Sequence, residues 1–274
     1  MRINNNIMAM NTHRQLGMTT DSSAKSMEKL SSGYRINRAG DDAAGLSISE
    51  KMRGQIRGLN QASRNSQDGI SLIQTAEGAL NETHAILQRM RELAVQSASD
   101  TNVTVDRASL NDEFKQLKSE ITRIGSNTQF NEKDILKAAN SVVLQVGANA
   151  GQQMTISLKA QTIGALGESA VSLTANSIST KAVASAAITQ VNSAIVSVSK
   201  SRSLLGAYQN RLEHTIKNLD TSSENLQASE SRIRDVDMAK EMMEFSKNNI
   251  LQQAAQAMLA QANQAPQGVL QLLR

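Results

Sequence analysis

The sequence predicts a mainly α-helical protein, with long antiparallel helices in a coiled-coil-like bundle and one small β-hairpin. Apolar residues recur at alternating steps of three and four positions in two long stretches, 52–94 and 188–233. This spacing places them on one face of a helix. The single proline, Pro266, lies near the C-terminus and interrupts neither stretch. Between the stretches, two short β-prone runs flank a glycine-containing loop, which is typical of a hairpin.

The first long helix is expected to run from about Ala43 to Gln96. Its stripe consists of Met52, Ile56, Leu59, Ser63, Ser66, Ile70, Ile73, Glu77, Leu80, His84, Leu87, Arg91 and Ala94, with a second register of Leu46, Leu72, Ala76, Ile86, Met90 and Leu93 beside it. A face of this width needs a helical partner along its length. The stripe at 188–233 has a matching length, and the long return path between the two favours antiparallel packing.

A polar segment, residues 33–42, precedes this helix and breaks the helical pattern. With glycines near both ends, it is expected to form an ordered bend or an extended connector. The residues expected to shape it are Gly33, Arg35, Asn37, Arg38 and Gly40. Asp41 and Asp42 stand just before the long helix, where carboxylates cap the first turn and complement the helix dipole.

The middle of the chain predicts a shorter helix over about Asp106–Ile124 and then the β-hairpin over about 141–159. Residues 160–184 are rich in Ala, Ser, Thr and Gly, so we expect an exposed connector that returns the chain to the second long helix. The long-helix bundle would therefore comprise residues 43–159 and 185–234.

The two chain ends resemble each other as apolar helices, thin in residues 1–32 and stronger and methionine-rich in 235–274. We expect them to pair as a separate domain of residues 1–42 and 235–274. A pair of helices has no third layer, so both ends should be poorly ordered in dilute monomer and gain order against copies of the chain or a dedicated partner. Open-ended packing of copies would give a helical filament, and a closed bundle is the alternative.

The composition argues against several other classes of protein. Cysteine is absent, aromatic residues make up 2% of the chain, and the net charge of +4 is spread along it, so thiolate chemistry, an aromatic ligand pocket and nucleic-acid binding are not expected. No segment approaches the roughly 18 apolar residues of a membrane span, and the N-terminus lacks the apolar region of a conventional signal peptide. His13, His84 and His214 are far apart, and no catalytic, cofactor or metal motif is found, so no enzyme is expected.

Several motifs make the chain resemble the bacterial flagellins, of the short, Bacillus-like type without large outer domains. The N-terminal matches are MRIN at 1–4, EKLSSGYRINRAGDDAAGLSIS at 28–49, NSQDGIS at 65–71 and QRMRELAVQ at 88–96. The C-terminal matches are RLEH at 211–214, SRIRDVDMA at 231–239 and QLLR at 271–274. They occur in order at both ends of the chain.

The resemblance implies a structural subunit that self-assembles into the helical flagellar filament for swimming motility. In that family the terminal helices form the inner tube, here through Ile3, Ile7, Met242, Phe245, Ile250, Leu251, Met258, Leu259, Leu270 and Leu273. It also implies export through the flagellar channel to the extracellular flagellum, with a chaperone at the C-terminal helix and filament cap and junction proteins as partners. Arg89, Leu93 and Glu113 match a site that an animal Toll-like receptor reads in flagellins, and packing between subunits is their alternative role.

Two other functions compete with a filament subunit. A hook–filament junction protein resembles flagellin mainly at its ends and would be expected to diverge at 88–96, where this chain matches well. A helical secreted effector or membrane-active bundle would carry a helix with a strong basic face, and the sequence has none.

Overall fold

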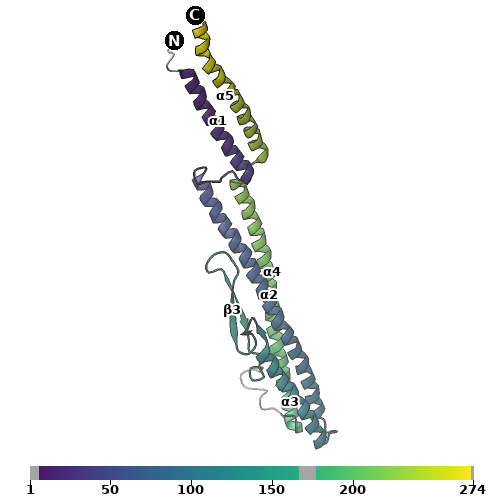
Figure 1. Cartoon of the computed structure of the whole chain (residues 1–274). Helices are drawn as coiled ribbons and strands as arrows, with labels where there is room; N and C mark the ends of the chain where they lie inside the picture. Colours follow the sequence, from purple (N-terminus) through teal and green to yellow (C-terminus); the bar gives the residue numbers. More distant parts are fainter. Residues whose placement is uncertain (1–5, 167–176, 273–274) are drawn as a thin grey trace. The chain divides into compact units, whose positions relative to one another are not determined.

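The computed structural model describes residues 6–166 and 177–272, with side chains described as far as residue 264. The elements are α1 (Ile7–Ser32), α2 (Ala43–Ala98), α3 (Thr104–Asn127), β1 (Gln129–Phe130), β2 (Lys133–Asp134), β3 (Asn140–Gln145), β4 (Gln153–Leu158), α4 (Lys181–Arg234) and α5 (Met238–Leu272). The described chain is mainly helical, its helices pack against one another, and β3 and β4 form a small antiparallel hairpin (Figure 1). This confirms the predicted fold class.

Two compact units divide the chain, one of Met1–Gln55 with Glu224–Arg274 and the other of Ile56–Ser223. The boundaries between these units lie inside α2 and α4. The sequence-based prediction instead places them after residue 42 and after residue 234. The start of α2 belongs with the terminal unit because it packs on that connector. Ile36 has no exposed surface, and a Cβ added to Gly45 would lie 2.8 Å from Ile36 Cδ1.

The unit Ile56–Ser223 is built on α2 and α4, which lie side by side (Figure 1). Ser223 of α4 contacts Asn60 of α2 at 2.9 Å, and Arg202 contacts Glu77 at 3.6 Å. Residue numbers therefore rise along one helix as they fall along the other, which confirms the antiparallel packing. The buried side chains are Leu72, Ile73, Ala76, Leu80, Leu87, Met90, Leu93 and Ala94 of α2, Phe114 and Ile121 of α3, and Ala184, Ala187, Val191, Ala194, Val198, Leu205 and Leu212 of α4.

The buried face of α2 does not follow the first predicted stripe along its whole length. It takes residues from both predicted stripes and some from neither. Glu77 and His84 are only half-buried, and Arg91 is exposed. Thr83 and Ser97, which belong to neither register, are buried. A straight α-helix has 3.6 residues per turn, so a face chosen at steps of 3.5 drifts off its partner over this length.

The β3–β4 hairpin contacts α2 at Gly69, which faces the side chain of Leu144. The strands pair with Val142 opposite Ile156, and the side chains of β4 alternate between buried and exposed positions. A Cβ on Gly69 would meet the terminal methyl group of Leu144, so a larger residue there would force that side chain to shift. Glycine inside a helix costs about 1 kcal/mol relative to alanine.

A second, smaller pairing joins β1 to β2 and was not expected from the sequence. Its two-residue turn, Asn131 and Glu132, has positive φ values of 49° and 64°. Hairpin turns of this kind usually carry glycine, and the absence of glycine here hides the turn from sequence patterns.

The prediction that residues 160–184 form an exposed connector is wrong at both of its described ends. Ile163, Leu166 and Ile178 are buried, and α4 begins at Lys181 rather than after 184. The backbone N–H of Ile178 donates to Asn111 Oδ1 at 3.0 Å. The average composition is small and polar, but three apolar residues, Ile163, Leu166 and Ile178, are buried at the described ends of the segment. Residues 167–176 lie outside the described part of the chain.

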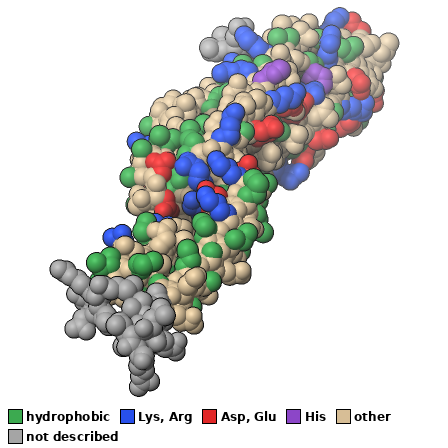
Figure 2. All heavy atoms as spheres, turned by 90° about the horizontal axis from the view of Figure 1, so that it is seen from above, with side chains coloured by type: hydrophobic (Ala, Val, Ile, Leu, Met, Phe, Trp, Pro, Cys, Tyr) green, Lys and Arg blue, Asp and Glu red, His purple; other side chains and the backbone are tan. Residues whose placement is uncertain are grey.

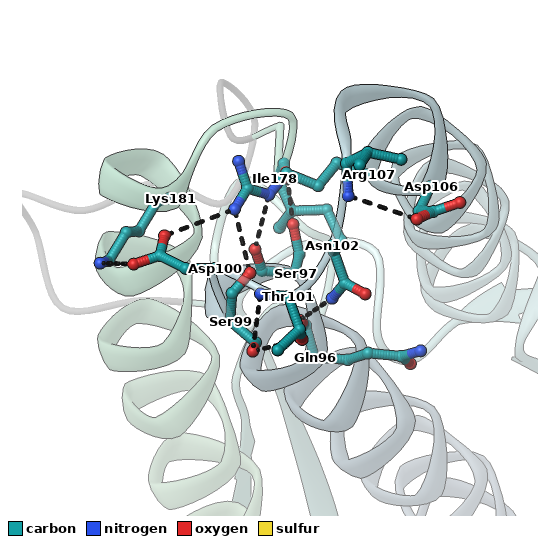
Figure 3. A network of polar contacts seen from close by, with 11 residues as sticks. Gln96, Ser97, Ser99, Asp100, Thr101, Asn102, Asp106, Arg107, Ile178 and Lys181 are labelled. Carbon is teal, nitrogen blue, oxygen red and sulfur yellow. Dashed lines mark hydrogen bonds and ion pairs between the residues drawn. The ribbon is translucent and has the colours of Figure 1, made fainter.

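The turn between α2 and α3 is held to α4 by a polar cluster (Figure 3). The guanidinium of Arg107 donates to the carbonyl oxygens of Ser97 at 3.1 Å and Ser99 at 3.0 Å, and it lies 3.8 Å from Asp100. Lys181 Nζ approaches Asp100 to 2.6 Å and lowers the pKa of that carboxyl. The cluster joins the first turn of α4 to the α2–α3 turn, so α4 starts earlier than its apolar stripe indicates.

One expectation about membranes needs correction. Within the described residues, α4 contains an 18-residue window of mean hydropathy 1.3, which is long and apolar enough to span a bilayer. The sequence was expected to hold no such segment. Core helices of soluble proteins meet the same criterion, although only 28% of this window is buried in the described structure.

Candidate functional site

The connector after α1 is paired with the connector after α4. Gly33 ends α1 in the left-handed region, with φ of 75°, and its N–H donates to Lys29 O at 2.9 Å. Such a cap favours glycine because other residues are strained there. Tyr34 then pairs with Asp235 as in an antiparallel sheet. Two backbone hydrogen bonds join the α1–α2 connector to the α4–α5 connector. Arg35 N–H donates to Arg234 O at 2.7 Å, and Val236 N–H donates to Gly33 O at 3.1 Å.

Side chains of the connector hold its shape at the surface. Arg38 forms a two-pronged ion pair with Glu28, at 3.0 and 3.1 Å, and Asn37 Nδ2 donates to Ser32 Oγ at 2.8 Å. The structure therefore brings together Gly33, Arg35, Asn37 and Arg38 from the predicted set. At Gly40 a Cβ would meet no other atom, so the local geometry does not require glycine there.

Asp41 closes the connector through its carboxylate. Oδ2 accepts the backbone N–H groups of Arg38 at 2.9 Å and Asn37 at 3.1 Å. The hydrogen bond from Arg38, followed by that from Asn37, lowers the pKa of Asp41 below its ordinary value. Hydrogen bonds to a carboxylate favour its charged form.

Acidification is expected to loosen this connector. Because folding lowers the pKa of Asp41, its contribution to stability is complete above the ordinary carboxyl pKa and is lost as the pH falls through the lowered one. In an NMR titration, the Asn37 and Arg38 amide shifts should therefore change with a midpoint below the ordinary aspartate value. Asp41→Asn keeps an acceptor and should remove this titration. A midpoint at or above the ordinary value would contradict the role assigned to Asp41.

The pair of α1 and α5 has its small and polar residues on the inside. The two helices lie side by side within their unit (Figure 1). Their buried residues are Thr19, Ser23 and Ser26 of α1 and Glu241, Ala255 and Ala262 of α5. Near one end, Asn6 Nδ2 donates to Ala262 O at 2.7 Å. Small residues let the helices approach closely, but they bury little apolar area between them.

Most of the large apolar side chains of the same pair point into solvent. Figure 2 shows hydrophobic side chains spread over the face of the terminal helices that it presents. The exposed ones are Ile7, Met8, Met10, Met18 and Met27 of α1 and Met238, Met242, Met243, Ile250, Leu251 and Met258 of α5, with exposed fractions from 42% for Leu251 to 69% for Met10. We call this set the outer apolar face; at about 100° per residue, its members are spread around both helices. Exposed large apolar side chains in this number are typical of a site covered by other proteins.

The predicted assembly residues fall largely on this surface. Ile7, Met242, Ile250, Leu251 and Met258 belong to the outer apolar face, and Phe245 and Leu259 are half-buried. Ile3, Leu270 and Leu273 lie outside the residues whose side chains are described. The predicted assembly set leaves out the exposed methionines of α1, which many Asn, Ser and Thr residues separate in the sequence.

The predicted receptor residues divide between surface and core. Arg89 Nε donates to Glu113 Oε1 at 2.9 Å, and the side chains of Arg89 and Glu113 are about half exposed, at 50% and 44%. Arg89 Nη1 also contacts Glu92 at 3.1 Å. Leu93 has no exposed surface and packs inside the bundle. The surface available to another protein here is therefore the Arg89–Glu113 pair.

In the part of the chain that the structure describes, no group of three or more His, Asp and Glu residues lies close enough to hold a metal ion. The feature that stands out among the described residues is the outer apolar face.

Comparisons with known proteins give the same result at both ends of the chain. Residues 3–141 match the family model described as bacterial flagellin N-terminal helical region, and residues 188–273 match that of the bacterial flagellin C-terminal helical region. The flagellin of Halalkalibacterium halodurans is 64% identical and that of Bacillus subtilis 56% identical, in both cases over all of this chain and all of the relative. The crystal structure of Bacillus cereus flagellin is 32% identical and covers 61% of this chain and 94% of its own, with a TM-score of 0.50. With both terminal regions matched in order and relatives aligned along their full length, the chain belongs to the bacterial flagellin family.

Proposed function

We propose that the chain is a structural subunit that polymerises with its own copies into the filament of an extracellular bacterial flagellum. The observation that carries this proposal is the outer apolar face of the α1–α5 pair. Eleven large apolar side chains lie in solvent there, while the buried residues between α1 and α5 are Ser, Thr and Ala together with Glu241. Membership of the flagellin family supports the same function.

The energetics favour burial of this face against further copies. Full burial of a Met, Ile or Leu side chain contributes about 1.5–3 kcal/mol. The seam between α1 and α5 gains little from this source, so the pair is weakly stabilised by itself. Because the face extends along both helices, one neighbouring copy would leave part of it in water. Contacts with several identical neighbours through different surfaces give an open, helical polymer.

Seeded growth tests the proposal directly. Purified monomer mixed with short sheared filaments is expected to lengthen the seeds, as seen by electron microscopy, until the monomer falls to a fixed residual concentration. Growth only into particles of one size would favour a closed bundle. The hook–filament junction alternative predicts that the protein adds a short terminal segment to seeds and then stops. The secreted-effector alternative predicts no growth at all.

Further partners follow from the same surfaces. We propose export through the flagellar channel, a chaperone that covers the apolar face of α5 before export, and cap and junction proteins at the filament ends. A chaperone is supported by Ile250, Leu251 and Met258, which would otherwise be exposed in the cytoplasm. For the animal Toll-like receptor, we propose that Arg89 and Glu113 provide polar contacts, because both are accessible in the isolated subunit.

A further inference from the structure

Methionine is the one sulfur-containing side chain of this protein, because cysteine is absent from its sequence. Twelve methionines are present. Eight of them lie on the terminal pair with exposed fractions between 48% and 69%: Met8, Met10, Met18, Met27, Met238, Met242, Met243 and Met258. They make up most of the outer apolar face.

Methionines in the other unit are placed differently. Met90 has no exposed surface and Met154 is 5% exposed, both within the core of α2, α4 and the hairpin. Oxidation of methionine depends on access to its sulfur. One chain therefore contains an exposed set of methionines on its association surface and a protected set that serves as an internal reference.

We propose that the eight exposed methionines form a reversible oxidation site, and that hydrogen peroxide acting on them stops the free subunit from joining the filament. This inference rests on the proposed function, since it requires the outer apolar face to be buried between copies. In each reaction the thioether sulfur attacks one peroxide oxygen. The O–O bond breaks and an S–O bond forms, so that the sulfur loses two electrons and the other peroxide oxygen leaves as water.

The sulfoxide opposes assembly because it replaces an apolar group with a strong hydrogen-bond acceptor. Burial of such a group without a donor is costly, and the apolar neighbours on this face have no side-chain donor to offer. Once the face is covered by copies, the same sulfurs are shielded from peroxide. The free subunit is therefore sensitive and the filament resistant. A methionine sulfoxide reductase, using two electrons from thiols, would restore the free subunit.

The test compares monomer and filament after the same peroxide treatment. Peptide mass spectrometry should find the eight methionines oxidised in the monomer and protected in the filament, with Met90 and Met154 unoxidised in both. Seeded elongation by oxidised monomer should fall by roughly tenfold to a hundredfold, the order expected for burying an uncompensated polar group. Treatment with methionine sulfoxide reductases should restore it.

Variants separate oxidation at this face from general damage. A chain with all eight methionines replaced by leucine keeps an apolar face of similar volume and should elongate seeds equally well before and after peroxide. The control, Met90→Leu with Met154→Leu, should remain as sensitive as the wild type. If the eightfold variant does not elongate untreated, reductase rescue of oxidised wild type decides the question. Unchanged elongation by oxidised wild type, or no rescue, would overturn the proposal. Failure of untreated wild type to elongate would instead overturn the proposed function on which it rests.

Discussion

A chain that lacks residues 250–274 is expected to lose seeded elongation completely while most of the helicity of residues 43–234 remains. The deletion removes Ile250, Leu251 and Met258 from the outer apolar face and Ala255 and Ala262 from the seam with α1. The unit Ile56–Ser223 has its own core and does not depend on these residues. Electron microscopy of seeded reactions and circular dichroism of the monomer measure the two effects separately.

A point substitution gives a sharper form of the same test. Ile250 is 66% exposed, so Ile250→Asp should leave the monomer unchanged and still block elongation, because the carboxylate would have to be buried between copies. Ile250→Leu keeps an apolar side chain and should elongate normally. Loss of helicity throughout the deleted chain, or growth of seeds by Ile250→Asp, would contradict the separate roles of the two units.

The largest effect on stability is expected at the α3 contact with the long helices. Phe114 is one of three phenylalanines in the chain and has no exposed surface. Phe114→Ala should lower the free energy of unfolding of the unit Ile56–Ser223 by about 3–5 kcal/mol, because it leaves a cavity that neighbouring Leu and Ile side chains fill only partly. Urea unfolding followed by circular dichroism measures the change, and hydrogen exchange assigns the transition to this unit.

Two control substitutions define the result for Phe114. Phe114→Leu keeps most of the volume and should have a clearly smaller effect than Phe114→Ala. Val105→Ala, at a side chain that is 74% exposed, should change stability by no more than about 0.5 kcal/mol. An effect of Phe114→Ala as small as that of Val105→Ala would mean that α3 is not anchored to the core by this ring.

Much of the fold could be predicted because it depends on local periodicity. An apolar spacing of three and four positions specifies a helical face wherever it occurs, so α2 was located to within two residues of its observed end at Ala98. The alternation in Met154, Ile156 and Leu158 likewise specified β4. The outer apolar face was predicted in part, since residues such as Ile250 and Met258 stand in a clear stripe.

Other features required contacts between distant parts of the chain. Nothing near Tyr34 in the sequence identifies Asp235 as its partner. The two residues pair because the α1–α2 connector lies beside the α4–α5 connector in the folded chain. The burial of Leu166 and Ile178 was hidden by the small, polar residues around them. Leu93 matches a receptor motif in sequence, yet its side chain is enclosed by the bundle.

The sequence by itself determined that this protein consists of long helices with a hairpin and that its ends carry apolar stripes. Only the tertiary structure decided which residues of the two terminal helices are buried between them and which are exposed. In the α1–α5 pair the close approach of the helices selects Ser23, Ser26 and Ala255 for the seam, and the larger methionines are therefore left in solvent. The reason is mainly steric: small side chains at these positions let the two helices approach closely, and the large buried side chain of Glu241 lies 3.9 Å from Lys29 of α1.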